Sequence, residues 1–151
     1  MPAVKDTTFG NSSELHPHLS LIVPCYNEEE VIAYTLPQLH DAFAKAGYRL
    51  QLVAIDNGSF DDTGTIIKTL AEQYPLIMCH RVETNQGYGY GVLQAMPLCT
   101  APWIGIIPAD GQVDVEDVVR LFAAITATRG RVLGKVRRRF RLDGIPRKLF
   151  S

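Results

Sequence analysis

The stretch Trp103-Ile104-Gly105-Ile106-Ile107-Pro108-Ala109-Asp110-Gly111-Gln112 joins an apolar run to an abrupt polar end. Residues 103–107 predict a buried strand, because a short apolar run bounded by turn residues is typical of a sheet core. Asp110 and Gln112 follow at i, i+2 spacing, so we expect both oxygen-bearing side chains to meet at one point on the sheet edge. Oxygen ligands suit a hard divalent cation. The stretch therefore predicts a cation site that serves a diphosphate.

The rest of the chain alternates short apolar runs with segments of helical periodicity. Strands are expected at residues 19–23, 50–55, 77–82 and 103–107, with 131–136 as a candidate for a fifth. Helices are expected at residues 28–46, 61–74, 88–98 and 115–128. Pro37 predicts a kink or a break in the first of these helices. Strands separated by helices of this length favour an α/β fold, with a mostly parallel sheet and helices on both faces.

Length and composition predict one soluble globular domain. The chain has 151 residues, 46% of them hydrophobic, which is enough to bury a core. We expect a flexible N-terminal arm at residues 1–17, the domain at 18–136 and a basic C-terminal segment at 137–151. No apolar run reaches the roughly 18 residues of a membrane-spanning helix. No secretory signal is recognisable at the N-terminus.

The formal net charge of −1 conceals a strong asymmetry along the chain. Residues 129–151 contain nine Lys or Arg and the single acid Asp143, whereas the rest contains six basic and fifteen acidic residues. A nucleic-acid-binding protein is disfavoured, because its basic surface would be confined to one end. Cys25, Cys79 and Cys99 lack a metal-binding spacing, so we expect reduced thiols in a cytoplasmic protein.

Polar loops are expected at the carboxyl ends of the strands, where sheets of this kind bind ligands. The first, residues 24–29, carries Pro24, Tyr26 and Glu28, which suit stacking on a base and hydrogen bonding to it. The same loop would also serve as an ordinary helix start. The second, residues 56–62, begins with Asp56, a carboxylate able to accept from a base or a ribose. Its Asn-Gly pair also marks a plain turn.

The third loop, residues 85–91, contains three glycines that would let the backbone approach a ligand or let the next helix pack closely. It lacks the spacing of a dinucleotide fingerprint and does not follow the first strand, which argues against a Rossmann dehydrogenase. The fourth loop, residues 108–112, would in isolation be a simple Asp-Gly turn. Because all four loops lie at one predicted edge and each carries a polar group, together they predict a nucleotide site.

In order and spacing, four motifs resemble the donor-binding half of family 2 glycosyltransferases with the GT-A fold. They are Val-Pro-Cys-Tyr-Asn-Glu-Glu (23–29), Asp-Asn-Gly-Ser (56–59), Asn-Gln-Gly-Tyr-Gly (85–89) and Ala-Asp-Gly-Gln (109–112). The resemblance runs from about Leu19 to Ser151 and is strongest to dolichyl-phosphate mannose synthases and bacterial polyprenyl-phosphate glycosyltransferases. It implies a Rossmann-like sheet that binds a nucleotide sugar. Relatives continue beyond the position of Ser151, so we expect this chain to lack the C-terminal acceptor part.

The resemblance also implies roles for single residues. Donor binding is assigned to Pro24, Tyr26, Asn27, Glu28, Asp56, Asn85, Gly87 and Ala109. Asp110 and Gln112 are implied to bind Mg2+ or Mn2+, and Asp110 to act in catalysis. The chain has Asn57 where the family usually has a second acid, and Pro108 where the metal motif usually begins with an acid. Asp110 is thus the single charged ligand of the implied metal site.

The implied reaction transfers a sugar, with inversion, from a GDP- or UDP-sugar to a polyprenyl phosphate. Arg137 and Arg147 of the basic segment are implied to contact phosphate groups and to act in catalysis, with Arg139 as an alternative. A basic cluster also suits an anionic membrane, so we expect a peripheral protein at the cytoplasmic face of a membrane, with no nucleic-acid partner. A solvated charged tail is the simpler interpretation of this segment. A non-catalytic nucleotide-sugar-binding module, or a truncated inactive glycosyltransferase, is the alternative function.

Overall fold

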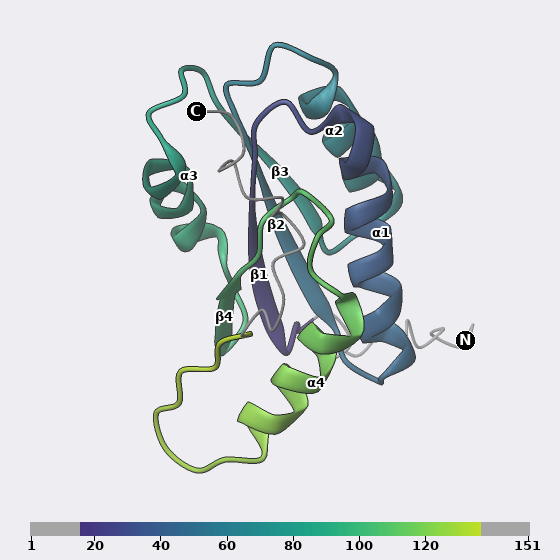
Figure 1. The fold of residues 1–151 in the computed structure, drawn as a ribbon, viewed down its shortest axis with the longest axis vertical. Coiled ribbons are helices and arrows are strands. Elements are labelled where there is room, and N and C mark those ends of the chain that lie inside the picture. Colours follow the sequence, from purple (N-terminus) through teal and green to yellow (C-terminus); the bar gives the residue numbers. More distant parts are fainter. Residues whose placement is uncertain (1–15, 137–151) are drawn as a thin grey trace, which may run out of the picture.

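The structure, a computed structural model, describes residues 16–136 (Figure 1). The expected basic segment at 137–151, with Arg137 and Arg147, lies outside the described residues, as does nearly all of the expected arm at 1–17. The strands are β1 (Leu19–Cys25), β2 (Leu50–Asn57), β3 (Ile77–Val82) and β4 (Trp103–Ile106). The helices are α1 (Glu29–Lys45), α2 (Thr63–Gln73), α3 (Tyr88–Ala95), the short 3-10 helix η2 (Met96–Leu98) and α4 (Val115–Thr126).

The four strands form one parallel sheet in the order β3-β2-β1-β4. Leu19 at the start of β1 pairs with Leu50 on one side and with Trp103 on the other, so the three strands begin level. Their carboxyl ends therefore lie at the same edge. Every residue of β1 and β2 is buried, as expected for central strands of a parallel sheet.

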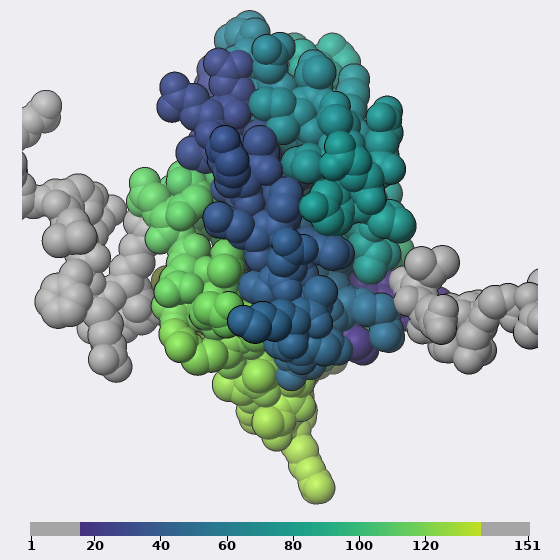
Figure 2. All heavy atoms as spheres, turned by 90° about the vertical axis from the view of Figure 1, so that its right-hand side faces the viewer, coloured from purple at the N-terminus to yellow at the C-terminus, as the bar shows by residue number. Residues whose placement is uncertain are grey.

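Helices cover both faces of the sheet, which confirms the predicted α/β arrangement. On one face, Leu21, Leu52 and their neighbours pack against the apolar sides of α1, α2 and α4. Figure 2 looks onto this face, where α1 runs down the middle with α4 beside it. On the other face, Ile22 and Val53 pack beneath α3, with Ala95 as the buried helix residue. Because side chains alternate along each strand, the strands contribute to two separate cores, one on each face of the sheet.

Helix α1 continues through Pro37 from Glu29 to Lys45, so the predicted break is absent. Proline costs the helix one backbone hydrogen bond. That cost is offset because α1 buries an apolar stripe in the main core, which includes Leu36, Leu39 and Phe43. Burial of this stripe, rather than local helix propensity, therefore stabilises α1.

Two expectations for the C-terminal half are wrong. Strand β4 is not buried, since Ile104 and Ile106 are 48% and 51% exposed at the edge of the described sheet. Residues 131–136 form no strand. They lie against α4 instead, where a Cβ on Gly134 would come within 2.7 Å of Ile125 Cγ2. The segment expected to pair as a strand thus packs on a helix, because periodicity does not specify the packing partner.

Candidate functional site

The four predicted loops converge at the carboxyl edge of the sheet, where they enclose a cavity of about 320 Å3. Seven residues assigned to the site from the sequence line it: Pro24, Tyr26, Glu28, Asn85, Gly87, Ala109 and Asp110. Four further residues line it that the sequence did not single out as donor contacts: Cys25, Asn57, Tyr88 and Pro108. We call this space the donor cavity. Three of the assigned residues, Asn27, Asp56 and Gln112, do not line it.

Asn27 ties the first loop to the second instead of facing the donor cavity. Its Oδ1 accepts from Phe60 N at 2.9 Å, and its own N–H donates to Ser59 Oγ at 3.1 Å. The next residue, Glu28, donates its N–H to Thr63 Oγ1 at 2.8 Å. Asn27 also has a φ of +54°, which asparagine tolerates better than most residues. The two loops are thus fastened together, and Asn27 positions Tyr26 and Glu28.

Asp56 is fully buried beneath the cavity. Its carboxylate pairs with Arg81, and its Oδ1 accepts from Ser59 N at 3.0 Å. A Cβ on Gly64 would come within 2.3 Å of Asp56 Oδ2, so α2 closes directly over this carboxylate. All of these contacts belong to the protein itself. Asp56 therefore supports the second loop from below, while the proposed contact with a base remains a prediction.

Asn57, the next residue, lies on the opposite face of β2 and lines the donor cavity. Its Nδ2 donates to Asn85 Oδ1 and to the Gly87 carbonyl, each at 3.2 Å. Its Oδ1 is the one buried side-chain polar atom among residues 16–136 that has no hydrogen-bond partner. Such an atom is costly to bury unless a ligand satisfies it. The strand alternation that hides Asp56 is what turns Asn57 toward the cavity.

Asp110 reaches the donor cavity, but Gln112 does not. The chain bends after β4, with Gly111 at a φ of +67°, so the expected i, i+2 alternation is lost. The Gln112 N–H donates to Asp110 Oδ1 at 3.0 Å, which holds the loop in this shape. The geometric expectation that both side chains meet at one point is therefore wrong. The assignment of Gln112 as a metal ligand stays a prediction.

The electrostatics of the donor cavity are acidic. Partial burial raises the pKa of Glu28 above its ordinary value, and the negative charges of Asp110 and Asp61 raise it further. Among residues 16–136, no Lys, Arg or His side chain lines the cavity. Burial chiefly raises the pKa of Cys25, which therefore remains a protonated thiol. A diphosphate could enter this cavity only together with positive charge from elsewhere.

The acidic end of the cavity fits a divalent cation. Glu28 and Asp110 both offer carboxylate oxygens, and a bound cation would relieve the repulsion between them. Within the described residues, no group of three or more His, Cys, Asp or Glu could hold a metal by itself. Mg2+ commonly uses one or two carboxylates and completes its shell with substrate phosphates. The side chains present therefore suit a cation that binds together with a diphosphate.

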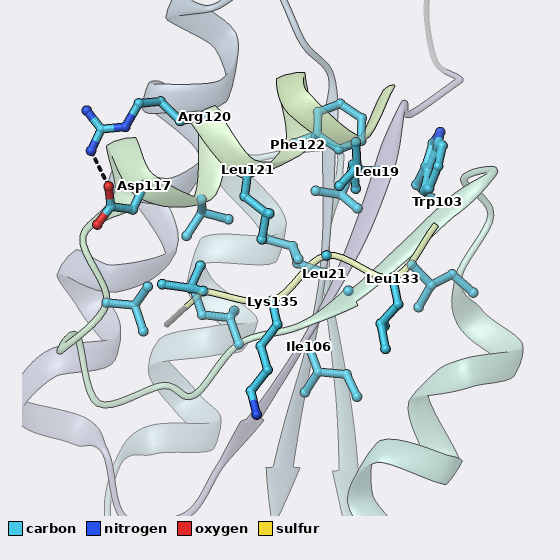
Figure 3. A pocket seen from close by; sticks show the side chains of 18 of the residues that line it. Leu19, Leu21, Trp103, Ile106, Asp117, Arg120, Leu121, Phe122, Leu133 and Lys135 are labelled. Atoms are coloured by element: carbon cyan, nitrogen blue, oxygen red, sulfur yellow. Dashed lines mark hydrogen bonds and ion pairs between the residues drawn. The ribbon is translucent and has the colours of Figure 1, made fainter. Parts of the chain in front are cut away.

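A second and larger cavity, of about 930 Å3, lies along the edge strand β4 (Figure 3). Its walls come from β4, α4 and residues 132–136, and include Trp103, Ile106, Leu121 and Leu133. Its two acidic residues are Asp114, which caps α4, and Asp117, which is paired with Arg120 of the same helix. We call it the edge cavity. Despite its size, its walls are mostly apolar and both of its carboxylates already have partners, so the smaller donor cavity is the better candidate for a nucleotide site.

Comparison with known proteins identifies the family. The profile described as Glycosyl transferase family 2 matches residues 20–149, so the chain belongs to this family. An uncharacterized glycosyltransferase of Mycobacterium tuberculosis is 33% identical over 119 residues, which are 79% of this chain and 49% of that protein. A bactoprenol glucosyl transferase of Shigella phage SfX is 30% identical over 117 residues, or 78% of this chain and 38% of the phage protein. The chain thus spans about half the length of these relatives or less.

Solved structures support the same fold. S. aureus TarS in complex with UDP-GlcNAc matches with a TM-score of 0.58 at 25% identity, covering 72% of this chain and 31% of that chain. The mannosyltransferase PcManGT from Pyrobaculum calidifontis, in complex with GDP-Man and Mn2+, matches with a TM-score of 0.51 at 27% identity. That match covers 63% of this chain and 28% of the mannosyltransferase. The sheet and helices described above are therefore the Rossmann-like part of the GT-A fold.

Asn57 is the most informative residue that the sequence reasoning missed. The Asn-Gly pair predicts a plain turn, and the sequence analysis assigns the base contact to its neighbour Asp56. The signal was available, because β2 was predicted to end at residue 55 and alternation places residues 56 and 57 on opposite faces. Tyr88 and Cys25 had no comparable signal, since their exposure to the cavity depends on how the loops fold.

Proposed function

We propose that this chain is the donor-binding part of an inverting glycosyltransferase that moves a sugar from a UDP- or GDP-sugar to a polyprenyl phosphate. One observation carries the proposal. Seven of the residues assigned to the site from sequence motifs line a single cavity at the carboxyl edge of a parallel sheet. This is the edge at which sheets of this class bind nucleotides.

The cavity offers separate surfaces for the parts of the donor. Tyr26, which is 42% exposed, provides an aromatic face for the base, and Glu28 a carboxylate for the ribose hydroxyls. Asn57 supplies an acceptor that has no partner among the described residues and that suits the base, a role that the sequence analysis assigns to its neighbour Asp56. Asp110 and Ala109 also line the cavity, and we assign them to the diphosphate, which is the leaving group. Mg2+ or Mn2+ bound at Asp110 would neutralise the charge on that diphosphate.

The reaction is a single displacement at the anomeric carbon. An anionic oxygen of the acceptor phosphate forms the new bond to that carbon, and the bond from the carbon to the donor's phosphate oxygen breaks. The nucleoside diphosphate departs with the electron pair, so the sugar is transferred with inversion. No proton has to be removed from a phosphate acceptor at neutral pH, and none of the described residues is required as a general base. The main demand on the protein is to stabilise the charge of the leaving diphosphate.

The relatives support this acceptor and these donors. The phage relative is named a bactoprenol glucosyl transferase, and an undecaprenyl-phosphate 4-deoxy-4-formamido-L-arabinose transferase of Klebsiella pneumoniae is 30% identical over 135 residues. The two solved neighbours hold a UDP-sugar and a GDP-sugar with Mn2+. A lipid acceptor would place the chain at the cytoplasmic face of a membrane. Arg137 and Arg147 would meet the phosphates there, since the donor cavity lacks cationic side chains among the described residues.

No helix within residues 16–136 has both the length and the apolar character needed to cross a bilayer.

A non-catalytic nucleotide-sugar-binding module is the second candidate. Pro108 favours it, because this residue lines the donor cavity at a position where the family usually has an acid. With Asp110 as the single charged residue of the fourth loop in the cavity, affinity for the cation would be lower than with two acids.

The test is nucleotide binding by the 151-residue chain, measured as thermal stabilisation with UDP- and GDP-sugars in the presence and absence of Mn2+. We expect one donor to raise the melting temperature, and Mn2+ to increase the effect. Asp110→Asn should remove the part that depends on Mn2+. Asp41→Asn is the matched control, because Asp41 is exposed on α1 and, among residues 16–136, pairs only with the neighbouring His40.

Two outcomes decide the proposal. If neither UDP- nor GDP-sugars stabilise the chain, or if Asp110→Asn leaves the Mn2+ effect intact, the proposed site is wrong. Transfer of a radiolabelled sugar to undecaprenyl phosphate in vesicles then separates the two candidates. Binding without transfer would favour the non-catalytic module.

A further inference from the structure

The amide of Asn57 is held in one orientation by the third loop. Its Nδ2 donates both hydrogens, one to Asn85 Oδ1 and one to the Gly87 carbonyl, each at 3.2 Å. Its Oδ1 has no partner among the described residues, although the residue is only 4% exposed. The side chain can therefore accept a hydrogen bond from a ligand, but it has no donor left to offer.

Two backbone groups of Gly87 determine this orientation. The carbonyl of Gly87 can only accept, so the atom of Asn57 that faces it must be the nitrogen. The N–H of Gly87 can only donate, and it donates to Asn85 Oδ1 at 2.8 Å. Asn85 therefore also turns its oxygen toward Asn57. A flipped Asn57 amide would set its oxygen against two other oxygens, which is unfavourable.

Close packing of two loops maintains this arrangement. Gly87 has a φ of +96°, a conformation that glycine adopts without strain. A Cβ on Gly58 would come within 2.8 Å of the Asn85 nitrogen, so only glycine allows the second loop to lie this close to the third. Gly91 of α3 packs against the other side of the Asn57 amide, where a Cβ would be 3.5 Å from Asn57 Cγ. The glycines of both loops thus allow the close packing that fixes the position of the Asn57 amide.

We propose that Asn85 is a positioning residue that fixes Asn57 as a hydrogen-bond acceptor, and that the site thereby selects a nucleobase with a ring N–H. This inference rests on the proposed function. Uracil and guanine carry such an N–H beside a carbonyl, whereas the corresponding ring nitrogens of cytosine and adenine are acceptors. A ring acceptor placed against Asn57 Oδ1 would leave both groups unsatisfied. The donor would therefore be a uridine or guanosine diphosphate sugar rather than a cytidine or adenosine one.

Because residue 57 is an asparagine, the orientation of its side chain is coupled to Asn85. The acid that the family usually has there could not donate to Asn85 Oδ1 or to the Gly87 carbonyl. In this chain the neutral amide makes both bonds, and Asn85 supports both of them, because its Oδ1 accepts from Asn57 Nδ2 and also from the Gly87 N–H that holds Gly87 in place. Asn85 itself is exposed, and replacing it should alter the amide without unfolding the domain.

The experiment compares natural nucleotides with analogues methylated at the ring nitrogen. The 151-residue chain is titrated with UDP, 3-methyl-UDP, GDP, 1-methyl-GDP, CDP and ADP in the presence of Mn2+. Of UDP and GDP, the nucleotide that binds more tightly should lose at least about tenfold in affinity when its ring nitrogen is methylated. This is the effect expected when one hydrogen bond is lost and its acceptor is left without a partner. CDP and ADP should bind at least about tenfold more weakly as well.

Variants of Asn85 separate positioning from simple steric exclusion. Asn85→Asp keeps an acceptor for Asn57 Nδ2 and for the Gly87 N–H, so the ratio between natural and methylated nucleotide should persist. Asn85→Ala should reduce that ratio below about threefold, while thermal melting shows an intact fold. A purely steric effect of the methyl group would leave the ratio unchanged in Asn85→Ala, and that result would overturn the inference.

The failure of this inference can be told from the failure of the proposed function. If none of the six nucleotides binds, the proposed function is wrong and the inference with it. If UDP or GDP binds the unmodified chain as tightly after methylation as before, the inference alone is wrong. This last comparison requires no variant, so it does not depend on the folding of a mutant.

Discussion

The donor cavity and the edge cavity differ in size and in chemistry, and the smaller one is the better candidate for a site. The edge cavity, about 930 Å3, is walled mostly by aliphatic and aromatic side chains, and both of its acidic residues have partners, Asp114 at the cap of α4 and Asp117 in its pair with Arg120. The donor cavity, about 320 Å3, contains Glu28 and Asp110, whose charges repel, and the unpartnered oxygen of Asn57. Unsatisfied polar groups therefore distinguish a ligand site here better than volume does.

The two cavities also differ in what holds their walls. The second loop of the donor cavity rests on the fully buried Asp56 and its partner Arg81. The edge cavity has a wall of residues 132–136, in which Leu133 is 96% exposed. A site that must orient a ligand needs rigid support from below. The three predictions that follow test this contrast, in order of decreasing effect.

Asp56→Asn should give the largest loss. Removing the charge leaves Arg81, which is 38% exposed, without its buried partner, so we expect the free energy of unfolding to fall by about 2 kcal/mol. Nucleotide affinity should fall too, because Ser59 N loses part of its support. The measurement is equilibrium unfolding in urea, with Asp117→Asn in the exposed pair of the edge cavity as the matched control. Equal stability of the two variants would show that the donor cavity is not supported from below.

Glu28→Gln should make the folded protein slightly more stable in EDTA while weakening nucleotide binding. Because the pKa of Glu28 is raised in the folded state, the folded protein holds this proton more tightly than the unfolded chain. The wild type should therefore lose stability relative to the variant as pH rises from the ordinary value of 4.5 through the raised one. The difference should be a few tenths of a kcal/mol, since solvent screens the site.

Thermal unfolding as a function of pH measures this difference. A variant that is less stable than the wild type at every pH would contradict the prediction, because it would mean that Glu28 makes a favourable contact with the protein. A functional site should instead gain stability when its repulsive charge is removed.

Ile106→Ser should have the smallest effect on nucleotide binding. Ile106 lines the edge cavity and is already 51% exposed, so the dissociation constant of UDP or GDP should change less than about twofold. Tyr26→Ser in the donor cavity is the paired variant, and the loss of its aromatic face should weaken binding about tenfold. Calorimetric titration measures both. A large effect of Ile106→Ser would mean that the two cavities act as one site.

Much of the fold was predictable because strong periodic signals agreed with the tertiary packing. The strands at residues 50–55 and 77–82 and the helix beginning at Val115 formed within a residue or two of their expected bounds. The helix at Val115 begins where Asp114 Oδ1 accepts from Glu116 N, a local cap that depends on neighbouring residues alone. The convergence of four loops followed equally, since the ends of parallel strands must share an edge.

Other features depended on contacts between segments far apart in the sequence. Asp56 and Gln112 carry suitable polar groups, yet Arg81 holds the first beneath the cavity and the bend at Gly111 turns the second away. Residues 131–136 have a pattern typical of a strand but lie against α4. Each of these residues and segments had more than one possible partner in the folded chain, and the sequence pattern does not show which partner it contacts.

By itself, the sequence determined the class of fold, the edge at which a ligand binds and the residue types available there, because these follow from periodicity and from where apolar runs end. Only the tertiary structure decided which polar groups face the ligand. Asp56 and Asn57 are neighbours in the chain, but β2 turns the buried Asp56 toward Arg81 and Asn57 toward the donor cavity. The physical reason is that a free acceptor is defined by the partners that it lacks, and those partners come from distant loops such as the one carrying Asn85.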